Sequence, residues 1–199
     1  MKLICASASP YARKVRVLIR EAGLEEAISE QAVTTSPLDS APQALAANPL
    51  GRIPALIRAE GPALYDSRVI CRYIDSLAET TFYPEARLWE VLTLEATAEG
   101  ILDSAVAMTY EARLRGDAAW PDWIEAQWAK IDRALDALEA RWMSHLSGPV
   151  TIGQIATGCA LAYLDLRQPD RDWRAQRPAL ADWAGRFSAR ATMRATTAE

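Results

Sequence analysis

The sequence predicts a small α/β domain followed by an all-helical domain. Short apolar runs typical of strands alternate with helix signals over the first eighty residues. From Pro84 onward no strand signal remains, and apolar residues recur at helical spacing. Strands and helices mixed over so few residues predict one sheet with helices on both faces. We therefore expect an α/β domain at residues 1–78, a linker at 79–87 and a helical domain at 88–199.

The first strand and the first helix are predicted close to the start of the chain. Residues 2–6 form a short apolar run typical of a strand. Ser9 is a favoured N-cap and Pro10 a favoured first helical residue, so a helix should begin there, and Gly23 predicts its end. The basic side chains of this helix partly share one face, which is expected to be solvated, with help for an anionic ligand as the alternative; they are Arg13, Lys14, Arg16 and Arg20.

With its remaining elements, the whole first domain has the predicted order β-α-β-α-β-β-α. Asn48-Pro49-Leu50-Gly51 has the composition of a turn, and Asp66 with Ser67 can cap the last helix. Strands are predicted at 28–33, 53–57 and 63–65, and helices at 40–47 and 68–77.

The second domain shows apolar positions separated alternately by four and three residues. This spacing predicts long helices over 94–108 and 124–142, a third over 155–166 and a fourth over 178–189. Thr151 and Gln154 have the spacing of a capping box, so we expect the third helix to begin there.

Composition excludes several classes of protein. The 199 residues carry a net charge of −4, and neither half has the basic surplus of a nucleic-acid-binding protein. One histidine leaves little room for a histidine metal site or a Ser-His-Asp triad. Three scattered cysteines indicate a reducing compartment, so we expect a cytoplasmic protein. Neither the first ten residues nor the uncharged stretch at 142–164 has the pattern of a signal peptide or a membrane span.

Three short segments could carry chemistry. Ser9 places a hydroxyl at a helix N-terminus, where free N–H groups favour an anion and a hydroxyl could stabilise a thiolate. A cis bond before Pro54 would turn the backbone of Ile53 outward, towards a peptide-like ligand. Asp66 and Ser67 could hold an ammonium and a carboxylate. Plain helix capping for Ser9, Asp66 and Ser67, and a trans Pro54, remain the alternatives.

The ordered set of these segments resembles the cytosolic glutathione S-transferase family over nearly the whole chain. It is nearest to a bacterial subgroup with a Ser-Pro-Tyr/Phe-x-Arg-Lys start, and Gly100-Ile101-Leu102-Asp103 matches another segment of that subgroup. The resemblance implies a thioredoxin-like first domain, a cis-proline at Pro54, glutathione as co-substrate, no metal and a homodimer. It also implies a role in detoxification.

The resemblance also implies the roles of individual residues. Ser9 stands where the family places the residue facing the glutathione sulfur, and the backbone of Ile53 would pair with the cysteinyl part. The γ-glutamyl end would be held by Asp66 and Ser67. The implied glutathione-binding set is Ser9, Arg52, Ile53, Pro54, Asp66, Ser67 and, reaching the other subunit's site, Asp103.

The expected activity is a transferase that presents the glutathione thiolate to an electrophilic, apolar small molecule. The expected pocket residues for that molecule are Tyr11, Met108, Tyr110 and Arg113. One alternative is a glutathione-dependent thiol reductase or peroxidase, and another is an interaction protein without activity. Small residues that would allow two subunits to approach closely are Ala96, Ala98, Gly100, Ser104, Ala105 and Ala107.

Overall fold

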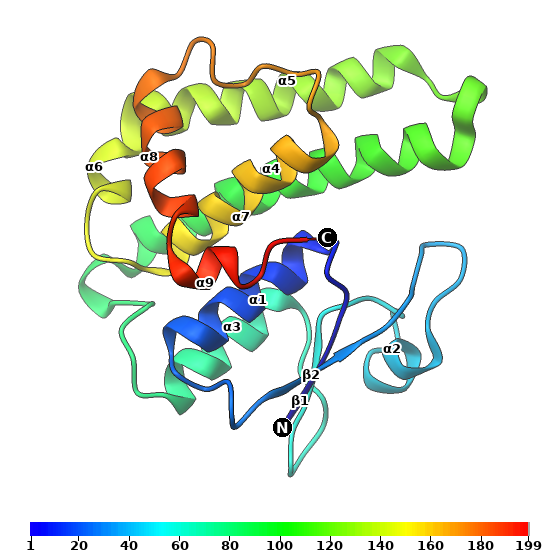
Figure 1. Cartoon of the computed structure of the whole chain (residues 1–199), viewed down its shortest axis with the longest axis vertical. Coiled ribbons are helices and arrows are strands. Elements are labelled where there is room, and N and C mark those ends of the chain that lie inside the picture. The colour runs from blue at the N-terminus through cyan, green and yellow to red at the C-terminus, as the bar shows by residue number, and fades with distance from the viewer. Residues whose placement is uncertain (199) are drawn as a thin grey trace. The chain divides into compact units, whose positions relative to one another are not determined.

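The computed structural model describes residues 1–198, which fall into two compact units (Figure 1). The first unit contains residues 1–83 together with residues 191–198, and the second contains residues 84–190. The chain therefore returns to its first unit near the end. The sequence assigned residues 191–198 to the helical domain, because a short helical segment carries no signal of the partner against which it packs.

A three-stranded sheet in the order β2-β1-β3 forms the centre of the first unit. β1 (Lys2–Cys5) runs parallel to β2 (Ser29–Ala32) and antiparallel to β3 (Ala55–Ile57). The strand predicted at 63–65 is reduced to one bridge between Leu64 and Leu56. Pro62 has no N–H to donate and the next helix begins at Ser67, so a longer ladder has no room.

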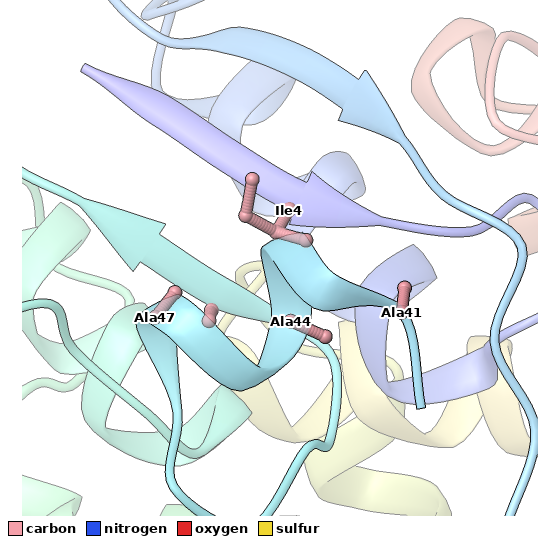
Figure 2. Close-up of a cluster of buried hydrophobic side chains, with 5 residues drawn as sticks. Ile4, Ala41, Ala44 and Ala47 are labelled. Carbon is pink, nitrogen blue, oxygen red and sulfur yellow. The ribbon is translucent and has the colours of Figure 1, made fainter. Parts of the chain in front are cut away.

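Helices cover both faces of this sheet. Figure 1 shows α1 (Pro10–Glu21) and α3 (Ser67–Leu77) on one face and α2 (Pro42–Ala47) on the other. The alanines of α2 lie against Ile4 of β1 in a small buried cluster (Figure 2). Small side chains let α2 approach the strand closely. α9 (Ala191–Arg194) packs against α1.

The second unit is helical. α4 (Leu88–Arg115) packs against both α5 (Pro121–Ala137) and α7 (Ile152–Arg167). A π-helical stretch at Leu138–Trp142 joins α5 to α6 (Met143–Leu146), and α8 (Pro178–Ser188) follows α7. The four predicted helical segments are thus confirmed. α4 extends beyond the predicted 94–108, and the segment predicted at 124–142 corresponds to α5 together with the π-helical stretch. Within residues 1–198, none of the helices has the length and apolar character needed to cross a bilayer.

The predicted start of α7 is confirmed. Thr151 and Gln154 form a reciprocal capping box, in which the Thr151 N–H donates to Gln154 Oε1 at 3.0 Å. The Nε2 group of Gln154 donates to the carbonyls of Pro149 (2.7 Å) and His145 (3.0 Å). This side chain therefore ties the loop before α7 to the first turn of the helix.

The basic face of α1 is not solvated, and that expectation was wrong. Lys14 is fully buried. Arg16 and Arg20 both pair with Glu30, with N–O distances of 2.6 and 2.7 Å. These pairs lower the pKa of Glu30, although burial, the largest single influence, acts to raise it. A helical wheel shows which residues share a face but cannot show that a neighbouring strand supplies a carboxylate.

The small residues of α4 do not share one exposed face. Ala98, Ser104 and Ala105 are buried inside the protomer, whereas Ala96 and Gly100 are exposed. Their identity alone did not separate the buried residues from those left at the surface.

Candidate active site in the first unit

The register of the sheet brings two of the predicted segments to one end of it. Ile4 pairs with Ala55, so the chain leaving β1 towards Ser9 lies beside the chain entering β3 through Pro54. The bridge between Leu56 and Leu64 then leads the chain to the start of α3, two residues later. The three segments therefore converge for a topological reason that the strand pairing makes explicit.

Ser9 is the N-cap of α1. Its backbone is extended (φ −81°, ψ 117°), and its Oγ accepts a hydrogen bond from the Ala12 N–H at 3.3 Å. The residue is partly exposed. A hydroxyl can accept and donate at the same time, so capping does not prevent Ser9 from donating to a bound anion.

The loop before β3 is held by a buried asparagine. Asn48 is 3% exposed; its Nδ2 donates to the Arg52 carbonyl at 2.9 Å, and its Oδ1 accepts from the Leu50 N–H at 3.0 Å. Gly51 has φ +63°, and a Cβ there would lie 2.6 Å from Ser40 Oγ, so only glycine fits. Asn48 was read only as a turn residue, yet it spans the loop that presents Ile53.

The peptide bond between Ile53 and Pro54 is cis, which confirms that prediction. The backbone hydrogen bonds of the loops and turns in residues 1–198 do not include Ile53. The N–H and C=O groups of Ile53 can therefore pair with the backbone of a peptide-like ligand. Arg52, the preceding residue, is exposed.

Asp66 is the N-cap of α3, and the Tyr65–Asp66 peptide bond is also cis. Asp66 Oδ1 accepts from the Arg68 N–H, and Oδ2 accepts from Arg68 Nη2, both at 3.0 Å. Burial acts most strongly on the pKa of Asp66 and raises it, but the hydrogen bonds and charge of Arg68 outweigh burial and lower the pKa overall. The carboxylate is therefore ionised at neutral pH. Ser67 is 2% exposed in the first turn of the same helix.

Lys14 is a second charge that acts on Asp66. Its positive charge also lowers the pKa of Asp66, although its side chain is fully buried on α1. This coupling places the charge of Lys14 on α1 within electrostatic range of the start of α3. Sequence reasoning missed it, because a lysine in an amphipathic helix is ordinarily exposed.

The remaining predicted residues lie in different surroundings. Tyr11 is half-buried on α1 and makes a polar or ring contact. On α4, Asp103 and Arg113 are exposed, Tyr110 is half-buried and Met108 is 2% exposed. The roles of these residues towards an electrophile or a second subunit stay predictions.

The chemistry of the first-unit site suits a small peptide that carries charges at its end. A carboxylate, the N-termini of α1 and α3 and the unbonded backbone of Ile53 occur together, and each is complementary to a different part of such a ligand. Within the described residues 1–198, no group of three or more His, Cys, Asp or Glu side chains is arranged to hold a metal ion.

Comparison with known proteins agrees with this arrangement. The glutathione S-transferase N-terminal domain family matches residues 8–77, and the glutathione S-transferase C-terminal domain family matches residues 121–186. The chain is 30% identical over 185 residues to the uncharacterised GST-like protein YibF of Escherichia coli K12, covering 90% of each.

Solved structures are similar over the full chain. A glutathione transferase family member from Pseudomonas fluorescens Pf-5 with bound glutathione is 41% identical, with a TM-score of 0.95 and coverage of 100% of this chain and 98% of that one. A structure of a Pf-5 family member with bound S-(propanoic acid)-glutathione is 40% identical, with a TM-score of 0.91 and complete coverage of both chains. The fold, the converging segments and these matches together show that the chain belongs to the glutathione S-transferase family.

Proposed function

We propose that this protein is a glutathione transferase whose first unit binds glutathione and activates its thiol. The observation that carries the proposal is the convergence of Ser9, Ile53 and Asp66 at one end of the sheet, each with a group suited to one part of the tripeptide. In this proposal the Ile53 backbone pairs with the cysteinyl residue, beside Arg52 and Pro54. Asp66 and Ser67 receive the γ-glutamyl end.

The proposed chemistry begins with loss of the thiol proton to solvent. The Ser9 hydroxyl donates a hydrogen bond to the resulting thiolate, and the N-terminus of α1 adds its dipole. The sulfur electron pair then forms a C–S bond with an electrophilic carbon. Either a leaving group departs with its bonding pair, or an activated alkene takes up a proton at the neighbouring carbon. Ser9 is not consumed, and no other reactant is required.

The electrophile is the second substrate of the proposal. Tyr11, Met108, Tyr110 and Arg113 are the proposed contacts, with the two tyrosines half-buried and Arg113 exposed. The Pf-5 relative was crystallised with a glutathione whose sulfur carries propanoic acid. That compound is a thioether of glutathione, the type of product that conjugation forms, so small electrophiles bearing a carboxylate belong in the first panel tested.

A thiol reductase fits the site less well. Such an enzyme needs a nucleophilic cysteine at the start of α1, where Ser9 stands. Cys5, Cys71 and Cys159 are free and buried, and burial raises the pKa of Cys5. We accordingly propose a transferase in a reducing, cytoplasmic setting.

We also propose a homodimer. The surface of α4 carries Trp89, which is 77% exposed, and the exposed residues Thr93, Ala96, Gly100 and Asp103 follow at helical spacing. A large exposed tryptophan beside small residues is typical of a surface that a second copy covers. Asp103 would then be available to the other subunit's site. Sedimentation at micromolar concentration should give the mass of two chains; a single-chain mass would contradict the proposal.

Thermal melting with glutathione tests the function directly. A ligand at 100 times its dissociation constant stabilises the folded state by about 2.7 kcal/mol, which a melt resolves easily. Cysteinylglycine, which lacks the γ-glutamyl end, is the matched control and should give a much smaller shift. Conjugation is then measured with the electrophile panel. Equal shifts with both ligands, or no shift with glutathione, would contradict the proposed site.

A further inference from the structure

Residues 191–198, here called the tail segment, are bonded to α1 along its length. The Met193 carbonyl accepts a hydrogen bond from Arg13 Nη2 at 3.1 Å, and the Thr196 carbonyl accepts from Arg16 Nη1 at 3.5 Å. At the other end of α1, Thr192 Oγ1 donates to Glu21 Oε1 at 2.5 Å. Figure 1 shows α9 lying beside α1.

The tail segment is packed as a part of the first unit. Met193 is 1% exposed and Thr196 is 0% exposed. The Thr196 hydroxyl bonds within the segment, to the carbonyls of Thr192 (3.0 Å) and Met193 (3.2 Å). Burial of both residues, together with satisfied polar groups, indicates a built contact and not a loosely attached end.

Arg13 links the tail segment to Ser9 through a single residue. Its side chain bonds to the Met193 carbonyl, and its backbone N–H donates to the Ser9 carbonyl at 2.9 Å. Its Nε is buried without a hydrogen-bond partner. Arg13 as a whole is half-buried, but a buried donor without a partner carries a desolvation cost, which the other contacts of this side chain must offset.

The cap itself holds Ser9 only weakly. The bond between Ser9 Oγ and the Ala12 N–H is 3.3 Å long, and the ends of helices are the parts that open most readily. A hydroxyl that must donate to a sulfur needs a defined direction, since displacement of a catalytic group by about 1 Å can cost up to about a hundredfold in rate.

We propose that the tail segment holds the first turn of α1 in place, and that Arg13 is the positioning residue that sets the direction of the Ser9 hydroxyl towards the glutathione sulfur. This inference rests on the proposed transferase function. It assigns a role in thiol activation to the tail segment, which lies more than 180 positions after Ser9 in the sequence. Ser9 makes no direct contact with the tail segment in the proposed reaction.

Four variants separate positioning from general stability. Arg13→Met removes the donors and keeps the aliphatic stem, and Arg13→Lys restores one donor for the Met193 carbonyl. Arg20→Met is the matched control, because Arg20 lies on the same helix but bonds to Glu30 and the Arg16 carbonyl. Thr196→Val loosens the tail segment without changing α1. It takes the place of Arg13→Met in the test if Arg13→Met does not fold.

The readouts are the ultraviolet absorbance of the bound thiolate against pH and the separate values of kcat and KM for glutathione. In Arg13→Met the pKa of the bound thiol should rise by about 0.5 unit or more. At pH values below that pKa, this rise reduces the thiolate fraction roughly threefold. The kcat should fall by the same factor while KM changes little. Arg13→Lys should return both values to those of the unchanged protein, Thr196→Val should shift them in the direction of Arg13→Met, and Arg20→Met should shift neither.

The outcomes distinguish the inference from the proposed function. If the unchanged protein lowers the glutathione thiol pKa and Arg13→Met lowers it equally, the positioning role is overturned and the transferase proposal stands. If Arg20→Met raises the thiol pKa as much as Arg13→Met does, the positioning role is again overturned and the transferase proposal stands. If the unchanged protein shows no thiolate absorbance with glutathione, both proposals are overturned.

Discussion

The starts of α1 and α7 are both capped by a hydroxyl residue, yet they differ in where their polar groups are directed. At α7, Thr151 is 4% and Gln154 is 2% exposed, and the capping box and loop carbonyls bind their side chains. At α1, Ser9 is partly exposed and its one cap bond is 3.3 Å long. The same local chemistry is therefore enclosed in one place and leaves a partly exposed hydroxyl in the other, the hydroxyl that we propose as the donor to glutathione.

The start of α3 lies between these two cases. Asp66 caps its helix and pairs with Arg68, but its side chain is 54% exposed, so oxygen lone pairs remain accessible. From the difference among the three caps we propose that exposure of the capping atom, and not the type of capping residue, separates a ligand site from a structural start. The predictions below test that distinction.

The largest effect is expected for glutathione binding in Asp66→Asn. Asparagine caps a helix as well as aspartate does, so the melting temperature should change little. The ligand ammonium loses a charged partner worth roughly 1.5–3 kcal/mol, and affinity measured by calorimetry should fall about ten- to a hundredfold.

The depressed pKa of Asp66 sets the pH dependence of this effect. The carboxylate contributes wherever it is ionised, and it loses its charge only as pH falls through a pKa below the ordinary range. Binding by the unchanged protein should therefore persist from about pH 7 to pH 5. An unchanged affinity in Asp66→Asn would place the γ-glutamyl group elsewhere.

Gly153→Ala tests how tightly the start of α7 is packed. A Cβ at Gly153 would lie 2.8 Å from Leu94 Cδ2 and 3.1 Å from Leu94 Cγ, so the whole leucine must move. Overpacking of this kind lowers the free energy of unfolding by about 1–3 kcal/mol.

Gly185→Ala is the matched control for that variant, because an added Cβ there has nothing within 4 Å on α8. The free energy of unfolding should rise by about 0.5–1 kcal/mol, since alanine favours a helix over glycine. Urea titrations measure both variants. A stable Gly153→Ala protein would show that the start of α7 is looser than its burial indicates.

Ser9→Ala tests the start of α1 as a site. The bound thiol pKa should rise by at least about one unit, or about 1.4 kcal/mol, and conjugation at neutral pH should fall about tenfold. Glutathione affinity should hold, because the ends of the tripeptide make most contacts. Ser9→Thr keeps a hydroxyl and is the control. If Ser9→Ala retains the same thiol pKa, Ser9 is only a cap, and Tyr11 or a backbone N–H is the next donor to test.

Apart from the control variants, Thr151→Ala should have the smallest effect. Loss of an N-cap lowers the free energy of unfolding by about 1 kcal/mol, and Thr151→Ser should recover most of it. Glutathione affinity in the folded protein should not change, because this cap belongs to the second unit. A change in affinity would contradict the division between structural and ligand-directed caps.

Local signals were sufficient for much of the fold. The caps at Ser9, Asp66 and Thr151 and the apolar spacing of α4 and α5 depend on neighbours a few residues apart, and the structure places helices at each. The cis bond before Pro54 was expected from the family resemblance, since an isolated X-Pro sequence favours trans.

The features that the sequence did not reveal depend on distant partners. Glu30 lies on β2 and meets Arg16 and Arg20 only once the sheet is formed. Lys14 is buried only once other elements pack against α1. Asn48 spans its loop because the folded loop brings the Arg52 carbonyl within reach of the Asn48 side chain. The tail segment was assigned to the helical domain because its contact with Arg13 joins residues 180 positions apart.

That long separation has a consequence for biosynthesis. The chain emerges from the ribosome at about 5–20 residues per second, and domains generally fold as they emerge. Residues 84–190 can complete their helical packing as soon as α8 has been made. The unit begun first must instead wait for Met193 before Arg13 finds its carbonyl. In this molecule the earliest-translated unit is therefore the last to be completed, and a nascent chain paused before residue 191 would display an unfinished α1 to chaperones.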